Sequence, residues 1–228
     1  YNENELKVLL VSSDMRFKLA SLKTIIKYLS LYTESFQNTF CRLLAYSSYR
    51  SSELSKLKND VFAHIDNKEL QAYVSLRHSE GGGDKFVRDE IELQLGSIKK
   101  RLCYFSYFLC EDPSVFDLAD SIVLKPDSKS QSYIQNRDRG LEILESQLVK
   151  TLLERKVFAA LVDNDRFLDQ HVSFEHNVGS ELMKKINEID NDILSKIIVL
   201  RKVKVFSRLS LEQVLSLVEI LKITTIES

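Results

Sequence analysis

The chain has 228 residues and a formal net charge of −1, with 32 Lys and Arg against 33 Asp and Glu. This balance excludes a global electrostatic attraction to nucleic acid, to an anionic membrane or to an acidic substrate, so such a partner would need a local patch. Apolar residues make up 44% and charged residues 29%, which is too apolar for a disordered chain and predicts a globular protein with a substantial core.

The sequence contains neither a run of ~18 apolar residues nor an N-terminal basic region followed by an apolar core. We therefore expect a cytoplasmic protein, which includes a place at the cytosolic face of a membrane. The chain begins with Tyr1, which suggests a piece of a longer protein.

Helix breakers are scarce: there are six glycines and two prolines, and no convincing alternating strand pattern occurs. The composition and the apolar periodicity predict an all-α fold. The expected helices, in chain order, lie at residues 14–30, 32–49, 51–64, 67–77, 87–110, 114–124, 132–150, 151–161, 179–201 and 210–221. Loops are expected at residues 78–85, 125–130, 163–165 and 171–179.

The clearest helical stripe starts at Val87 and advances in steps of three and four residues. Asp112-Pro113 predicts that this helix ends near Cys110, because the residue before a proline avoids helical geometry. The stripe consists of Val87, Ile91, Leu95, Ile98, Leu102, Phe105 and Leu109.

Two stretches have the look of helical repeat units. In residues 12–29, Asp14 can cap a helix and Arg16 follows in its first turn; in residues 136–148, Arg137 precedes the small Gly140. Both resemble the second helix of a HEAT repeat, although any amphipathic helix that begins with Asp or Asn gives a similar string. We expect an irregular HEAT/armadillo-like helical stack.

The expected organisation has four parts. Residues 1–80 form N-terminal helical repeats, 81–85 a flexible loop, 86–201 a HEAT-like region, and 202–228 a helical lead-in. The loop contains Gly81-Gly82-Gly83, whose ordering costs much backbone entropy, and it is either a natural linker or an edited junction.

Residues 86–161 resemble the HEAT-repeat region of bacterial proteins related to ATP/ADP translocases. In that family a long helix, a short helix and an Arg-x-x-small-Leu-Glu-x-Leu helix precede an acidic loop. The matching positions here are Arg137, Gly140, Leu141, Glu142 and Leu144, followed by Asp163 and Asp165 in the loop.

The stretch "KVKVFSRLSLEQVLSLVEIL", residues 202–221, resembles the lead-in helices of a cyclic-nucleotide-binding domain. Ser210 would cap the second helix, and Gln213 could complete a capping box. The β-roll that holds the cyclic phosphate in that family does not follow Ser228, so this chain is not expected to bind a cyclic nucleotide in that way. The alternative is a helix corner in which Phe206 merely fills the core. The residues expected at an inter-domain contact are Val205, Phe206, Leu209, Val214 and Leu217.

We find no sequence signature of catalysis, cofactor binding or metal binding, and we expect no enzyme. His171 and His176 are five apart, which does not place both on one helical face, so they are expected at the surface. Two basic clusters, Lys99-Lys100-Arg101 and Arg201-Lys202-Lys204, are candidates for phosphate contacts, but helical clusters of this kind more often form solvated faces or complement a helix C-terminus. Cys41, Cys103 and Cys110 are expected as reduced core thiols.

These observations favour a non-enzymatic helical scaffold or regulatory module, a cytosolic fragment of a larger transporter-related protein, that contacts another protein or a neighbouring domain. We expect neither a cofactor nor a nucleic-acid partner, and a membrane only through another portion of a larger chain. The alternative is a stand-alone helical-bundle subunit of a tethering or assembly complex, which binds a partner helix through an exposed apolar patch of Phe36, Phe40, Leu43 and Leu44.

Overall fold

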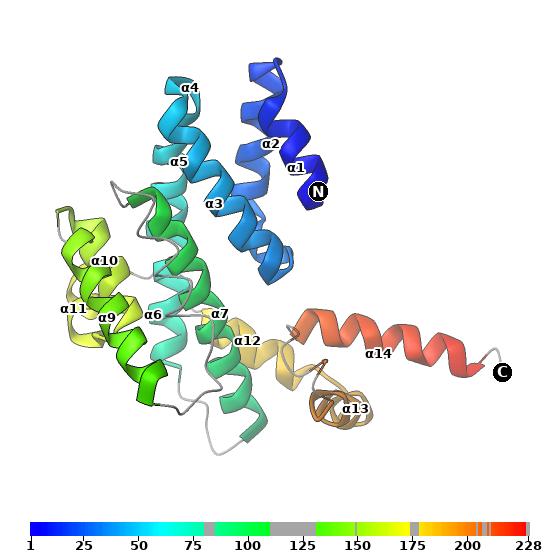
Figure 1. Ribbon diagram of the computed structural model, residues 1–228. Helices are drawn as coiled ribbons and strands as arrows, with labels where there is room; N and C mark the ends of the chain where they lie inside the picture. The colour runs from blue at the N-terminus through cyan, green and yellow to red at the C-terminus, as the bar shows by residue number, and fades with distance from the viewer. Residues whose placement is uncertain are drawn as a thin grey trace. The chain divides into compact units, whose positions relative to one another are not determined.

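The structure is a computed structural model that describes residues 1–79, 85–109, 131–148, 150–173, 178–203, 205–206, 209 and 211–226. Over these residues the chain is helical and contains no strand, which confirms the all-α prediction (Figure 1). The HEAT/armadillo-like arrangement stays a prediction. The expected helix at 114–124 and the expected loop at 125–130 lie outside the described residues, as do residues 80–84 of the loop expected at 78–85; Lys85 already belongs to the helix that follows.

Residues 1–109 form helices α1 Glu3–Val11, α2 Met15–Lys27, the short 3₁₀ helix η1 Leu29–Leu31, α3 Glu34–Arg50, α4 Ser52–Ser55, α5 Leu57–His64, the π-helix η2 Ile65–Leu70, α6 Gln71–Arg77 and α7 Lys85–Leu109. Residues 131–226 form α9 Gln131–Gln147, α10 Leu152–Leu161, α11 Asp165–His171, α12 Val178–Asn187, α13 Asn191–Arg201 and α14 Leu211–Ile226.

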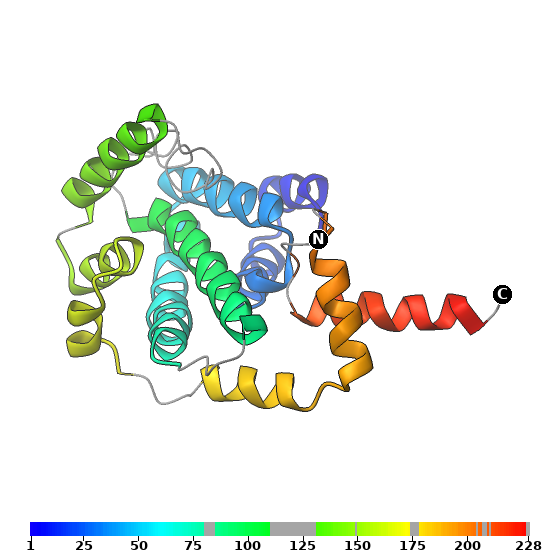
Figure 2. The ribbon, with the colours of Figure 1, turned by 90° about the horizontal axis from the view of Figure 1, so that it is seen from below.

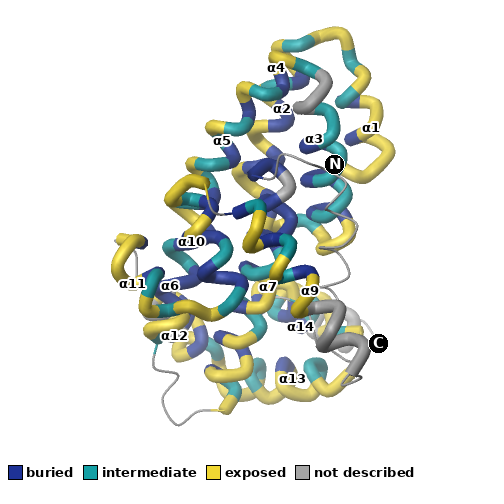
Figure 3. Tube along the Cα trace, turned by 60° about the vertical axis from the view of Figure 1, so that its left-hand side comes forward, coloured by how far each residue is buried: buried dark blue, intermediate teal, exposed yellow. Residues whose placement is uncertain are grey.

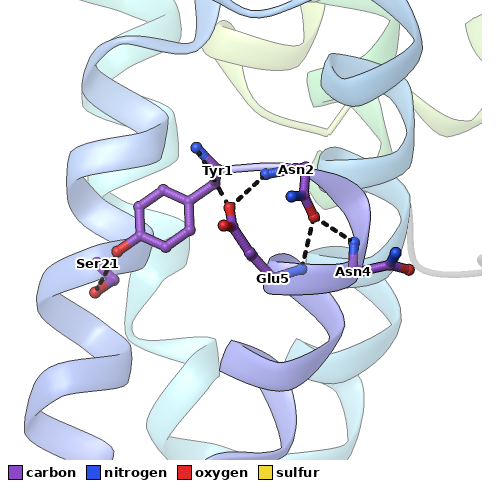
Figure 4. A network of polar contacts seen from close by, with 5 residues as sticks. All are labelled: Tyr1, Asn2, Asn4, Glu5 and Ser21. Atoms are coloured by element: carbon purple, nitrogen blue, oxygen red, sulfur yellow. Dashed lines mark hydrogen bonds and ion pairs between the residues drawn. The ribbon is translucent and has the colours of Figure 1, made fainter.

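The first two helices begin at side-chain caps. Asp14 accepts a hydrogen bond from the Phe17 amide at 3.0 Å, so the predicted cap of α2 is confirmed. Helix α1, which the sequence analysis missed, starts with a capping box between Asn2 and Glu5. The Tyr1 hydroxyl donates to Ser21 of α2 at 3.2 Å and ties this end of α1 to its neighbour (Figure 4).

The helices pack into two compact units, which we describe separately. Unit 1 comprises residues 1–74 and 98–174, and unit 2 comprises residues 75–97 and 175–228, so α6 and α7 each contribute to both. This division follows packing contacts, and the four-part organisation expected from the sequence stays a prediction.

In unit 1, α1 packs on α3, α2 on α5, and α10 on the π-helix η2. Buried and exposed positions alternate along these helices with the helical period (Figure 3). The C-terminal half of α7 supplies much of the core, together with aromatic residues from α3 and α6. The largest fully buried side chains there are Phe40, Tyr73, Tyr104, Phe105 and Phe108.

The apolar patch expected for binding a partner helix does not lie on the surface. Phe36, Phe40 and Leu44 are buried in the core, and Leu43 is half-buried. The prediction of an exposed patch is therefore wrong, because the apolar face of α3 is covered by neighbouring helices of its own unit.

The segment proposed to match the translocase-related helix forms α9. Gly140 and Leu144 are buried in it, Leu141 is half-buried and Glu142 is exposed. The side chain of Arg137 lies outside the described residues. A small residue at buried position 140 allows close helix packing, which many unrelated helical proteins share.

Unit 2 contains the N-terminal half of α7 and helices α12, α13 and α14, of which α13 packs against α14 (Figure 2). The prediction of a single helix at 179–201 is wrong. The chain turns at Glu188 to Asp190, and Asp190 caps α13. The helix expected at 210–221 is present as α14. A second helix that the prediction missed, α11, belongs to unit 1.

Candidate interaction surface and buried charge clusters

Glu69 forms the most deeply buried ionic cluster described in unit 1. Its Oε1 atom accepts a hydrogen bond from Arg101 Nε at 2.9 Å and lies 3.3 Å from His64 Nε2. All three side chains are at most one-tenth exposed. The Arg101 guanidinium and the His64 contact outweigh desolvation and lower the pKa of Glu69 to about 2, so the carboxylate is ionised at neutral pH.

The contact between His64 and Glu69 depends on the π-helix. Residues five apart lie about 140° apart around an α-helix and do not meet, whereas a wider π turn brings them to one face. The spacing of the buried apolar residues also indicates the π turn. Leu57, Val61 and Ile65 are buried at intervals of four, and the next fully buried apolar residue, Leu70, follows after five. This interval of five is the sequence signal of the π turn, and the helical run continues where a break was predicted between residues 64 and 67.

The π turn also presents Asp66 to another helix. Lys156 of α10 donates to Asp66 Oδ1 at 2.8 Å, and the lysine side chain is nearly buried. The extra residue in this turn therefore serves two polar contacts, with Glu69 facing α7 and Asp66 facing α10.

A cysteine, a histidine and a carboxylate, the residue types of a nucleophilic site, occur around Glu69. The state of the Cys41 thiol does not fit such a site. Cys41 is fully buried, and desolvation together with the nearby Glu69 charge raises the pKa of its thiol well above the usual range. A protonated, inaccessible thiol is not a nucleophile. Cys41 and Cys103 are buried free cysteines as expected, and Cys110 lies outside the described residues.

The basic run at 99–101 does not form a phosphate site or a solvated face. Lys99 Nζ lies 2.5 Å from Asp163, Lys100 Nζ lies 2.8 Å from Glu34, and Arg101 contacts Glu69. Consecutive residues of a helix point in different directions, so each cation of α7 meets an acid from a different part of unit 1.

Asp163, predicted in an acidic loop, sits at the end of α10 with a φ of 56°. The Asn164 amide donates to the Ala159 carbonyl at 2.8 Å, which is the pattern of a helix that ends in a left-handed residue. The hydroxyl of Tyr73 donates to the Asp163 carboxylate at 2.7 Å, beside Lys99. Asp165 begins α11, and His171 at its end stacks on Phe167.

Unit 2 has its own buried carboxylate, Glu90 of α7. It contacts Arg201 of α13 at 2.6 Å and accepts a hydrogen bond from the Leu211 backbone amide at the start of α14. Glu90 thus joins three helices. Burial raises the pKa of Glu90 despite the Arg201 charge. The sequence signal was a Glu three residues after Val87, inside the apolar stripe.

The five residues expected at an inter-domain contact are placed differently. Val205 is 77% exposed, Phe206, Leu209 and Leu217 are half-buried, and Val214 is fully buried. Backbone hydrogen bonds from Phe206 to Val203 and from Leu209 to Phe206 form the turn before α14. Ser210, the expected cap, lies outside the described residues.

Aliphatic residues are exposed around this corner of unit 2. Helix α14 buries Leu211, Val214 and Val218 and exposes polar residues such as Glu212 and Glu219 on another side. Near its C-terminal end the aliphatic residues Ile220 and Leu221 are 57% and 52% exposed. We call the exposed aliphatic residues of this corner the C-terminal surface; they are Ile198, Val199, Val203, Val205, Ile220 and Leu221.

The residues that the structure describes contain no group of three or more His, Cys, Asp and Glu side chains placed to hold a metal ion. They also contain no helix with the length and apolarity needed to span a bilayer. His176 and Lys204 lie outside them.

No family model, no curated protein and no solved structure matches this chain. The resemblances to translocase-related proteins and to cyclic-nucleotide-binding domains therefore stay expectations drawn from sequence motifs.

Proposed function

We propose that the protein is a helical scaffold or regulatory module that binds a neighbouring domain or a protein partner through the C-terminal surface. The finer parts of this proposal are an irregular HEAT/armadillo-like stack and a place on the cytosolic side of a larger transporter-related protein. These finer parts rest on the sequence resemblances alone.

The observation that carries the proposal is the character of α14. Each aliphatic side chain that a helix leaves uncovered forgoes the free energy of leaving water. Over the described residues, α14 packs mainly on α13, and Ile220 and Leu221 stay more than half exposed. A covering surface from another domain or protein would bury them.

Unit 2 exposes further aliphatic residues before α14. Val199, Val203 and Val205 are exposed on α13 and on the turn that follows it. Clusters of exposed aliphatic residues on a folded protein commonly mark interaction sites, whereas single exposed ones do not. Glu90 of α7 contacts both α13 and the start of α14. This contact fixes the position of α13 relative to the start of α14, the two helices that carry most of the C-terminal surface.

A photo-crosslinking amino acid at Val205 tests the proposal in the cell of origin, with the same group at Val8 of α1 as a control of similar exposure. We expect a specific protein adduct at Val205 that is absent at Val8. The identified partner, once purified, should bind the chain saturably and lose affinity with Val199→Asp. Equal labelling at both positions, or binding that ignores Val199→Asp, would contradict a role for this surface.

A further inference from the structure

Four residues of the C-terminal surface, Ile198, Val199, Val203 and Val205, lie in a stretch of the chain whose charged residues are all basic. Residues 193–210 contain five basic residues and no acidic residue, in a protein whose net charge is −1. The basic residues are Lys196, Arg201, Lys202, Lys204 and Arg208.

Two of these cations flank the exposed aliphatic residues. Lys196 of α13 and Lys202, the C-cap residue that follows this helix, lie three residues before and after Val199, which places them on either side of Val199 on the helix surface. Both lysines are exposed, whereas Arg201 turns the other way and pairs with Glu90. Lys196 contacts Asp192 one turn earlier, so Lys202 is the better placed of the two to meet a partner.

We propose that the C-terminal surface binds an amphipathic helix whose apolar face is flanked by acidic residues. This inference rests on the proposed function and adds the chemistry of the partner. Aliphatic contact with Val199 and Val203 would supply most of the affinity, and carboxylates opposite Lys196 and Lys202 would select the partner and its orientation.

A protein helix fits this surface better than an anionic bilayer does. Membrane-interface segments typically carry Trp and Tyr at the headgroup level, and this chain has no Trp and no Tyr after Tyr133.

The probe for the test is a pair of synthetic amphipathic peptides about five helical turns long, with the same leucine face and either Glu or Lys at the flanking positions. Each is titrated into the full chain by calorimetry at about 50 mM and about 300 mM NaCl. We expect saturable binding of the Glu peptide that weakens with salt. The double variant Lys196→Glu, Lys202→Glu should weaken it about tenfold, whereas Lys7→Glu on α1 should leave it unchanged.

The outcomes separate the two proposals. Equal binding of both peptides would overturn the acidic partner and leave the interaction surface. Absence of binding by either peptide would overturn both. Vesicles of phosphatidylcholine with phosphatidylglycerol serve as the third probe: if they bind the chain and the Glu peptide does not, the partner is an anionic membrane and the inference is wrong.

Discussion

Two buried carboxylates, Glu69 in unit 1 and Glu90 in unit 2, differ in the direction of their pKa shifts. Both meet an arginine at hydrogen-bond distance, at 2.9 Å and 2.6 Å. The pKa of Glu69 is lowered to about 2, whereas burial raises the pKa of Glu90. The comparison teaches that donors at hydrogen-bond distance need not offset the desolvation of a buried carboxylate. The pKa of Glu90 stays raised although Arg201, Gln94 and the Leu211 amide all contact it, whereas the Arg101 charge and the hydrogen bonds from His64 and Arg101 outweigh desolvation at Glu69.

The largest expected effect is on unit 1. Glu69→Ala leaves Arg101 buried beside His64 without its carboxylate, and we expect a loss of about 4 kcal/mol in the free energy of unfolding, measured by urea denaturation. The control is Glu34→Ala, which removes the acid beside Lys100 at a half-exposed site and should cost at most about 1 kcal/mol. Equal losses would show that burial does not distinguish the two contacts.

The pH dependence of the Glu69 contribution follows from its lowered pKa. The unfolded chain binds the proton near pH 4.5 and the folded chain only near pH 2, so stability from Glu69 is present above pH 4.5 and is lost as the pH falls toward about 2. The total is about 3 kcal/mol. Urea titrations across this range should show a slope that Glu69→Gln removes.

Glu90 should respond with the opposite sign. Because its pKa is raised in the folded protein, its contribution to stability decreases as the pH rises from 4.5 through the folded pKa and is constant above it. Carboxyl NMR titration provides the measurement: the Glu90 signal should move above pH 4.5, while the Glu69 signal stays that of a carboxylate. If the carboxyl groups of Glu69 and Glu90 titrated with the same midpoint, the expected difference between their pKa values would be contradicted.

Deletion of Asn67 tests whether the π turn is a one-residue insertion. Without that residue, Ile65 and Leu70 would be four apart, and a regular α turn could keep both buried. We expect a folded protein that loses about 1 kcal/mol, mainly from the contact of Asp66 with Lys156.

Deletion of Thr39 is the control for that experiment. In the regular helix α3 it puts the turns on either side about 100° out of phase, so the core around Phe36 and Phe40 should be disrupted. Circular dichroism melting of both variants supplies the measurement. If the two deletions are equally damaging, the π turn is not an insertion that the helix can lose.

The smallest expected effect concerns glycines within helices. Gly96 of α7 is exposed and a Cβ there meets open space, so Gly96→Ala should raise the free energy of unfolding by about 0.5 to 1 kcal/mol. Gly140 of α9 is buried, and Gly140→Ala should lower it. Thermal melts of the two variants should shift in opposite directions.

The sequence predicted the helical class and the stripe of α7 because these depend on a periodicity that runs through many residues. It predicted the cap at Asp14, which is a local interaction. It did not predict the turn at Glu188 to Asp190, because apolar Ile186, Ile189 and Ile193 continue the helical spacing across it. Nor did it predict that the face with Phe36 and Phe40 is covered, since coverage depends on distant helices.

The candidate site was predicted in part by position and not by detail. Five residues between Val205 and Leu217 were predicted at the contact, but Val214 is core. The exposed residues Ile198, Val199, Val203, Ile220 and Leu221 were not among the five. An exposed aliphatic residue and a buried one look alike in a sequence. Glu90 and Glu69 stand inside apolar stripes, which signals a buried partner, but only the fold specifies which arginine provides it.

The π turn at 65–70 has a consequence for sequence comparison. Residues 57–65 and 70–77 belong to one continuous helical run, but their apolar positions follow two frames that differ by one residue. A relative without the extra residue would align correctly over this run only with a gap inside the helix, where gaps are normally penalised. A search that allows a single-residue gap at 65–70 is therefore better suited to finding distant relatives than one that treats this run as an ungapped block.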